Sequence, residues 1–238
     1  MTNLLAHHDS YLKNFEATVV AVKAEENIIV LDRTAFYPGG GGQPCDLGAI
    51  SVAGDILKVI KVSKQGGEIW HWVEGVLPQV GAAVQGEIGW ERRYKLMRTH
   101  TAMHILCGVI WRDYQASVTG GNMEPLRGRM DFEFESMRKE LVQEIEERIN
   151  AEVEAARNVQ VKILPREEAF QIPDLIRTKI NLLPAGIEEV RVVEIVGLDL
   201  QADGGTHVAN TREVGIIKVV DYKSKGRINK RIEVEISD

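Results

Sequence analysis

Residues 91–113, ERRYKLMRTHTAMHILCGVIWRD, mark the point at which the character of the chain changes. Apolar side chains recur along this stretch with the three- and four-residue spacing of an amphipathic helix. The sequence before it consists of short β-like runs, whereas longer helical and strand-like segments follow it. The stretch therefore predicts a helix that opens a second structural region.

The part of the chain before this helix has the pattern of a small β structure. Four β-branched or aromatic runs are broken by Gly, Asn and Asp, at intervals of roughly ten residues. These runs are FEATVVAV (15–22), NIIVLDR (27–33), DILKVIKV (55–62) and EIWHWVEG (68–75). The spacing predicts a small barrel or sandwich over residues 1–88, with LPQVGAAVQGEIG (77–89) as a return strand.

A glycine run interrupts these strands. Gly39, Gly40, Gly41 and Gly42 follow one another within TAFYPGGGGQPCDLG (34–48), flanked by two prolines. Neither a helix nor the interior of a strand accommodates this composition. We predict a loop of unusual backbone freedom, either a plain long turn or a segment whose main chain approaches a ligand.

Residues 89–238 combine helical and strand patterns and predict a two-layer α+β domain. A second long helix is expected over 136–157 with Ser136 as its N-cap, and a glycine-containing loop over 116–128. The expected strands and the closing hairpin are RMDFEFE (129–135), VQVKILP (159–165), VRVVEIVGLDLQ (190–201) and residues 215–236.

Composition narrows the class of protein. The 238 residues are 44% hydrophobic with a net charge of -6, which argues against nucleic-acid binding by bulk charge. No apolar run approaches the ~18 residues of a transmembrane helix, and the N-terminus lacks the pattern of a signal peptide. Two cysteines in different contexts indicate no disulfide framework. We expect a cytoplasmic globular protein that does not enter a membrane.

Local basic clusters remain compatible with a nucleic-acid partner. Each cluster is either a contact surface or a solvated face of the protein. The first consists of Arg92, Arg93, Lys95 and Arg98, and the second of Lys223, Lys225, Arg227, Lys230 and Arg231.

A candidate metal site emerges from the histidines. His100 and His104 are four apart on the predicted helix, so both rings share one face and can grip one ion. Two packed histidines would have the same spacing. However, DGGTH (203–207) follows a predicted strand, and its glycines let Asp203 and His207 point in the same direction. Three histidines with a carboxylate or a water are a plausible zinc set that leaves room for a reacting group.

These motifs together resemble the editing domain of alanyl-tRNA synthetase and its freestanding relatives, the AlaX proteins. The resemblance covers nearly the whole chain and rests on five stretches. They are TAFYPGGGGQPCDLG, WERRYKLMRTHTAMHIL, RGRMDFEFE, LPREEAF and LQADGGTHVANTREVGIIKV. It implies an N-terminal β-barrel followed by an α+β editing domain. It also implies hydrolysis of the ester that joins a misplaced serine or glycine to alanine tRNA.

The same resemblance implies roles for particular residues. His100, His104 and His207 are similar to the zinc ligands of the family, whereas Asp203 stands where the family commonly has cysteine. Asp203 either binds the metal, which admits zinc or another divalent ion, or orients its neighbours. Cys107, one turn after His104, is either a replacement ligand or a buried small side chain.

Substrate discrimination also has candidates. Thr119 resembles a threonine of the family that senses the substrate hydroxyl, and Gln43 resembles a glutamine of its serine-editing site. Both are also compatible with ordinary loop positions. We expect the first basic cluster, which lies just before His100 and His104 in the sequence, to contact the tRNA, with the second cluster as the next candidate.

Other functions fit parts of the pattern. A tRNA-binding or metal-binding module without catalysis is compatible with the departure at Asp203. A metallohydrolase acting on a small molecule would not need the glycine loop and the separate barrel. A complete synthetase is excluded, because the chain is too short to hold an ATP-binding catalytic domain as well.

Overall fold

The chain is a mixed α and β protein. The computed structural model describes residues 2–176 and 186–238, and it separates into two compact units, Met1–Lys95 and Leu96–Asp238. The boundary lies inside the long helix α1 (Trp90–Tyr114), which confirms the helix predicted over 91–113. Among the described residues, no helix combines the length and the hydropathy that a bilayer-spanning segment requires.

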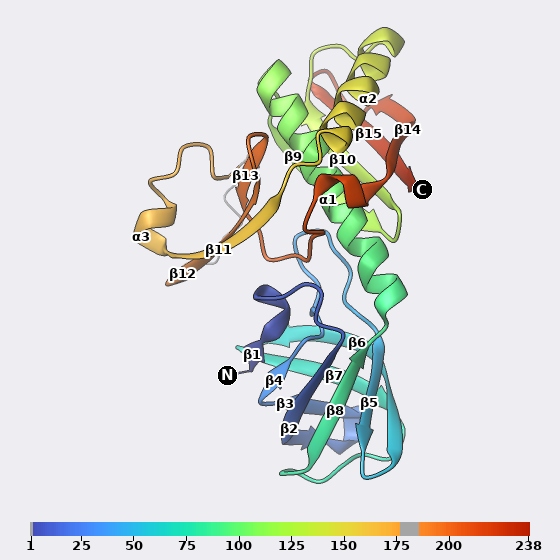
Figure 1. The fold of residues 1–238 in the computed structure, drawn as a ribbon, viewed down its shortest axis with the longest axis vertical. Coiled ribbons are helices and arrows are strands. Elements are labelled where there is room, and N and C mark those ends of the chain that lie inside the picture. Colours follow the sequence, from blue (N-terminus) through green and yellow to red (C-terminus); the bar gives the residue numbers. More distant parts are fainter. Residues whose placement is uncertain (1, 177–185) are drawn as a thin grey trace. The chain divides into compact units, whose positions relative to one another are not determined.

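The N-terminal unit contains a closed six-stranded barrel in the order β2-β3-β7-β6-β5-β8, which confirms the predicted β-barrel. Figure 1 shows these strands side by side around the barrel, in the blue and cyan part of the chain. The barrel strands are β2 (Asn14–Lys23), β3 (Ile28–Leu31), β5 (Gly48–Val52), β6 (Asp55–Gln65), β7 (Glu68–Glu74) and β8 (Ala83–Ile88). The short elements around them are β1 (Asn3–Leu4), β4 (Arg33–Thr34), η1 (Leu5–His7) and η2 (Ala24–Glu26).

Alternating burial explains why these runs close into a barrel. In β2 and β8, exposed and buried residues alternate, so one side of each strand turns inward. The inward residues form one apolar core, which includes Phe15, Leu31, Ile50 and Leu57. β5 falls at the end of the segment that the sequence predicts as a glycine loop, and its pairing with β6 and β8 completes the barrel.

The predicted glycine loop is present between β4 and β5. Gly39, Gly40, Gly41 and Gly42 all have positive φ, from 58° to 138°, a region that side chains with a Cβ rarely adopt. Gly40 and Gln43 exchange two backbone hydrogen bonds of 3.0 and 2.9 Å and close a tight turn. The run of glycines is therefore required by the backbone itself.

The C-terminal unit holds two sheets and the helices packed with them. The four-stranded sheet has the order β14-β15-β10-β9, and the three-stranded sheet has the order β11-β12-β13. Their strands are β9 (Val118–Glu124), β10 (Arg127–Glu133), β11 (Val159–Pro165), β12 (Glu189–Ile195), β13 (Asp199–Ala202), β14 (Ile216–Ser224) and β15 (Asn229–Ser237). The remaining helices are α2 (Lys139–Glu154), α3 (Arg166–Ala169) and η3 (Thr211–Val214).

Helix α2 packs on the four-stranded sheet, where Figure 1 shows it beside β14 and β15. Asn150 bonds both the carbonyl and the amide of Ile217 on β14, at 2.7 and 3.0 Å. The closing hairpin predicted over 215–236 is confirmed as β14 and β15. The predicted two-layer arrangement of the whole domain stays a prediction.

Two local predictions were wrong. α2 begins at Lys139 rather than at Ser136, and Arg138 occupies its N-cap position without a side-chain cap. The expected loop over 116–128 contains the edge strand β9, because pairing with β10 overrides the low strand propensity of its glycines. The β run predicted over 190–201 is confirmed, and it forms the hairpin β12–β13 with a turn at Gly197, where φ is 76°.

Candidate metal centre

Four side chains from two distant parts of the sequence meet in the C-terminal unit. His100 and His104 stand one turn apart on α1, and Asp203 and His207 lie on the loop after β13. Each offers a ligand atom, and these atoms all lie within 4.8 Å of one another. The structure therefore brings together the four residues that the sequence singles out as candidate ligands.

The three imidazoles converge on one point inside the protein. The ring centroids of His100 and His207 lie 4.3 Å apart, those of His104 and His207 4.7 Å, and those of His100 and His104 5.2 Å. All three histidines are buried. Three bulky polar rings at such distances bury many nitrogen atoms together, an arrangement that a shared cation stabilises.

The carboxylate of Asp203 lies against two of these rings. Its Oδ2 is 2.9 Å from Nε2 of His207, and its Oδ1 is 3.5 Å from Nε2 of His100. Ligand atoms bound at roughly 2.1 Å by a tetrahedral zinc lie about 3.4 Å from one another. The two separations of Asp203 are near this value and all four ligand atoms lie within 4.8 Å of one another, so three nitrogen donors and one oxygen donor could hold a single divalent ion.

A second set of residues fixes the orientation of the candidate ligands. Nδ1 of His104 lies 2.9 Å from Oδ2 of Asp199, and Nδ1 of His207 lies 3.2 Å from the hydroxyl of Thr101. These contacts leave Nε2 of both rings for an ion, as in metal sites whose histidines bond an outer carboxylate or hydroxyl. Sequence reasoning missed Asp199 and Thr101. The sequence held one signal for each residue: Thr101 directly follows the candidate ligand His100, and Asp199 lies four residues before the candidate ligand Asp203.

Asp203 is held in place from the strand beside it. Asp203 N donates to the carbonyl of Arg191 at 3.1 Å, and Nη1 of Arg191 donates to the carbonyl of Asp203 at 2.9 Å. The same Nη1 is 3.8 Å from the carboxylate, and the amide of Gly205 donates to Oδ2 at 2.7 Å. The loop that carries Asp203 and His207 is thereby tied to β12.

The electrostatic environment prepares these groups for metal binding. Burial lowers the pKa of His207 to about 4 and lowers that of His100 well below its ordinary value. Burial alone would raise the pKa of Asp203, but the neighbouring imidazoles, His100 foremost, hold it well below its usual range. At neutral pH, these two histidines are therefore neutral and Asp203 is ionised, the states that metal ligands require.

His104 differs from the other two rings. Burial alone would lower its pKa, but the hydrogen bond and the charge of Asp199 outweigh burial and raise it. Burial is the largest single influence on the pKa of this ring, but Asp199, with a smaller contribution from the charge of Asp203, reverses its direction.

Cys107 does not belong to the group of four. It is buried, and its Sγ lies 3.4 Å from Nε2 of Gln201. Within the described part of the chain, the candidate ligand set contains only histidine and aspartate.

The predicted recognition residues lie in different units. Gln43 and the four glycines belong to the N-terminal unit, where the Gln43 side chain is buried. Thr119 belongs to β9 of the C-terminal unit, and its exposed hydroxyl donates to Oδ1 of Asn229 at 3.0 Å. Their roles in substrate recognition stay predictions.

The first basic cluster is not a continuous surface. Arg93 is fully buried, and its guanidinium donates to both carboxylate oxygens of Asp46 and to the carbonyls of Ser10 and Ala35. A side chain with these partners presents no charge to a nucleic acid. The assignment of Arg93 to a tRNA-contacting surface is therefore corrected, and Arg93 is a structural residue of the barrel unit.

Arg98 is also engaged inside its unit. Its Nε donates to the carbonyl of Val214, its Nη2 to the carbonyl of Ser237, and its Nη1 pairs with Asp238 at 2.8 Å. With 8% of its surface exposed, Arg98 fastens α1 to the C-terminal strand rather than facing solvent.

Of the first cluster, Arg92 and Lys95 are half-buried, and the ammonium of Lys95 pairs with Glu91 at 2.5 Å. In the second cluster, Lys230 is buried and donates to the carbonyls of Gly226 and Arg227. Arg231 forms a two-bond ion pair with Asp131. Lys223, Lys225 and Arg227 are exposed, and Lys223 pairs with Asp221 at 3.1 Å and with Glu233 at 3.0 Å.

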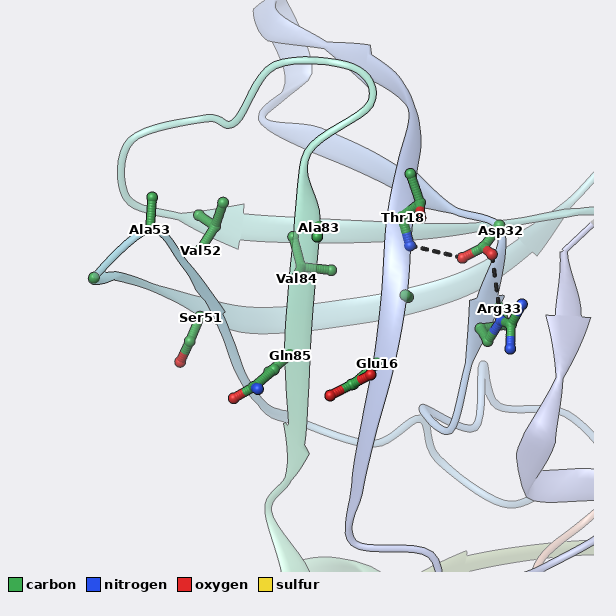
Figure 2. Close-up of a pocket in the computed structure, with 12 residues that line it drawn as sticks. Glu16, Thr18, Asp32, Arg33, Ser51, Val52, Ala53, Ala83, Val84 and Gln85 are labelled. Atoms are coloured by element: carbon green, nitrogen blue, oxygen red, sulfur yellow. Dashed lines mark hydrogen bonds and ion pairs between the residues drawn. The ribbon is translucent and has the colours of Figure 1, made fainter.

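A surface pocket of about 590 Å³ lies in the N-terminal unit. Figure 2 shows its wall, in which Asp32 accepts from the amide of Thr18 at 2.8 Å and from Nε of Arg33 at 3.2 Å. Asp32 and Arg33 neutralise each other there. The residues that line the pocket include none of the four candidate ligands.

Two family profiles match this chain, one in each of its two units. The family profile described as tRNA synthetases class II (A) matches residues 5–92. The profile described as the threonyl and alanyl tRNA synthetase second additional domain matches residues 190–233, which include Asp203 and His207. The chain is thus related to the aminoacyl-tRNA synthetases.

Individual relatives narrow this class. The alanyl-tRNA editing protein AlaX-M of Saccharolobus solfataricus is 41% identical over 238 residues, 98% of each chain. That of Methanosarcina barkeri is 36% identical over 244 residues, which is all of both chains. The alanine--tRNA ligase of Pyrobaculum aerophilum is 41% identical over 92% of this chain but 25% of the ligase. The chain belongs to the alanyl-tRNA editing proteins of the AlaX-M type, which confirms the resemblance seen in its motifs.

Proposed function

We propose that this protein is an aminoacyl-tRNA deacylase that removes a wrongly attached amino acid from alanine tRNA. The observation that carries the proposal is the buried group of His100, His104, Asp203 and His207, in a chain that matches editing proteins over its full length. The reaction adds water across the ester carbonyl, breaks the bond to the ribose oxygen, and releases the amino acid and the tRNA. Since its substrate takes part in translation, we place the protein in the cytoplasm.

We propose zinc as the resident ion, held by His100, His104, His207 and Asp203. Imidazole and carboxylate donors suit zinc, and the oxygen donor also admits other divalent ions. When bound, such an ion supplies a Lewis acid that polarises an oxygen of the substrate or of water. The protein contributes the imidazole and carboxylate donors, their fixed orientation and the burial of the site.

The choice of substrate requires a polar recognition site. Serine differs from alanine by one hydroxyl, and a site built to bond that hydroxyl is left with unpaired polar groups when alanine enters. We propose Gln43 and Thr119 for this recognition, with Gly39–Gly42 shaping the main chain near the substrate end. The misplaced amino acid would be serine. Glycine would leave room for a water that pairs with the same polar groups, whereas the methyl group of alanine would displace that water and leave them unpaired.

The direct test uses alanine tRNA charged with serine, glycine or alanine. Each ester is incubated with the purified protein, with and without a chelator, and the remaining charged tRNA is measured. Loss of the serine and glycine esters, retention of the alanine ester, and rescue of chelated protein by added zinc are expected. The variant His100→Ala serves as the inactive control, and Lys139→Gln, an exposed lysine on α2, as the active one.

The alternative is a tRNA-binding or metal-binding module without catalysis, and Asp203 in the place of the usual cysteine is the feature that favours it. In that case, all three esters would survive equally while charged tRNA still bound to the protein. That outcome would overturn the deacylase proposal and leave the metal group as a structural site.

A further inference from the structure

One face of α1 carries three buried residues at a spacing of four: His100, His104 and Gly108. Residues with this spacing lie above one another on a helix. A Cβ on Gly108 would lie 2.9 Å from Cγ of Leu198 and 3.0 Å from Cβ of Asp199. The glycine therefore allows the start of β13 to approach the helix one turn beyond His104.

This close approach has a cost for the helix itself. Glycine in a helix interior is less favourable than alanine, because it loses more backbone freedom on folding. Gly108 is not at a helix end, because α1 continues to Tyr114. A glycine at position 108 is explained by the close approach of Asp199, for which a larger side chain would leave no space.

Asp199 is directed at His104 and is itself held in position. Its side chain is fully buried, and its Oδ2 lies 2.9 Å from Nδ1 of His104. Nε2 of Gln201 donates to the same Oδ2 at 2.7 Å. Asp199 also pairs with Ile195 across the β12–β13 hairpin, so its backbone position is fixed by the sheet.

We propose that Asp199 is a positioning residue for the metal site, brought into place by the glycine at position 108. Its carboxylate accepts the Nδ1 proton of His104, which fixes the ring orientation and leaves the lone pair of Nε2 facing the ion. Gln201 holds the carboxylate in this orientation. The inference rests on the proposed metal site and extends it to residues that are not ligands.

The test measures zinc affinity by competition with a chromophoric chelator, using the full-length protein. Asp199→Ala is expected to weaken zinc binding roughly 10- to 100-fold, the usual effect of losing an outer partner of a ligand histidine. Asp199→Asn keeps an oxygen that accepts from both Nδ1 of His104 and Gln201. It is therefore expected to recover part of the affinity.

A second variant tests the same contact without altering Asp199. Gly108→Ala improves helix propensity but places a methyl group where Leu198 and Asp199 now pack. It is expected to weaken zinc binding, by less than Asp199→Ala does, by moving the carboxylate away from His104. This variant also keeps the proposal testable if Asp199→Ala does not fold.

The matched control is Asp131→Ala. Asp131 is another largely buried aspartate of the same unit, and it pairs with Arg231. Its removal is expected to leave zinc affinity unchanged, even if the protein becomes less stable. The comparison separates an effect on the metal site from a general effect of removing a buried carboxylate.

A spectroscopic measurement reports on the bond itself. In the zinc-loaded protein, the Nδ1 proton of His104 is held by a buried carboxylate and should give a downfield proton resonance protected from exchange. Asp199→Ala should remove this resonance, and Asp131→Ala should keep it. Unchanged zinc affinity in both Asp199→Ala and Gly108→Ala would overturn the inference, whereas a wild-type protein that binds no divalent ion would overturn the proposed metal site as well.

Discussion

Asp203 and His207 are four residues apart, and the Asp203 Oδ2 lies 2.9 Å from Nε2 of the His207 ring. The carboxylate is therefore close to the nitrogen that faces the other candidate ligands, while Thr101 contacts the opposite nitrogen of His207. This contact is compatible both with Asp203 as a direct ligand and with Asp203 as a residue that orients the His207 ring.

Replacement of Asp203 should distinguish the two roles. If Asp203 is a ligand, Asp203→Ala removes one of four donors and should weaken zinc binding by more than the Asp199→Ala substitution does. Asp203→Cys should restore tight binding, since a thiolate is a strong zinc ligand. Asp221→Ala, at an exposed aspartate of β14, is the control. Equal zinc affinity in Asp203→Ala and in the control would contradict direct ligation.

The buried pair of Arg93 and Asp46 should be important for stability. Arg93→Met leaves the Asp46 carboxylate buried without its cation, which is expected to cost roughly 3–5 kcal/mol. Adding Asp46→Asn should recover part of this stability, because the neutral amide still has an oxygen that accepts from the amide of Tyr37. Urea unfolding of the single and double variants measures the difference. A double variant no more stable than Arg93→Met would contradict this explanation.

Acid should destabilise the barrel unit through His71. This ring is buried between Thr34 and Ile29, and burial lowers its pKa to about 4 from an ordinary value of 6.5. The unfolded chain therefore takes up a proton at a pH where the folded chain does not. Above pH 6.5 this ring does not reduce the free energy of unfolding, and between pH 6.5 and about 4 it lowers that free energy progressively. The decrease in stability attributable to this ring is about 3 kcal/mol.

The pH effect can be isolated with His71→Gln. The variant is expected to be less stable at neutral pH but to lose less stability between pH 6.5 and 4 than the wild type does. Chemical unfolding followed by tryptophan fluorescence at several pH values gives both quantities. The same pH dependence in both proteins would show that His71 is not the cause.

Binding of tRNA should depend on Arg92 and Lys95, the members of the first cluster that are only half-buried. Arg92→Gln combined with Lys95→Gln should weaken binding of alanine tRNA. The slope of log affinity against log salt should fall by about 1 for each tRNA phosphate that the protein no longer neutralises. Lys139→Gln is the control, since this exposed lysine begins the acidic helix α2. If neither affinity nor slope differs from the control, the tRNA-binding surface lies elsewhere, with Lys225 and Arg227 as the next candidates.

The sequence alone determines the features of this protein that arise from residues close together in the chain. The strand runs of the barrel are visible because residues facing the core recur at every second position. The His100–His104 pair is visible because a helix places residues four apart on one face. The glycine loop and the two candidate ligand motifs are short, so their residue types show directly in the sequence. The family resemblance draws on these same stretches.

Only the tertiary structure decides which residues meet across long sequence separations. Asp199 contacts His104 across 95 residues, and Arg93 contacts Asp46 across 47. A charged residue near a functional motif therefore looks the same in the sequence whether it faces solvent, as Lys225 does, or is buried with a partner, as Arg93 is. Pairing with β10 likewise makes a strand of the glycine-containing segment β9. In each case, the free energy comes from an interaction that local sequence does not encode.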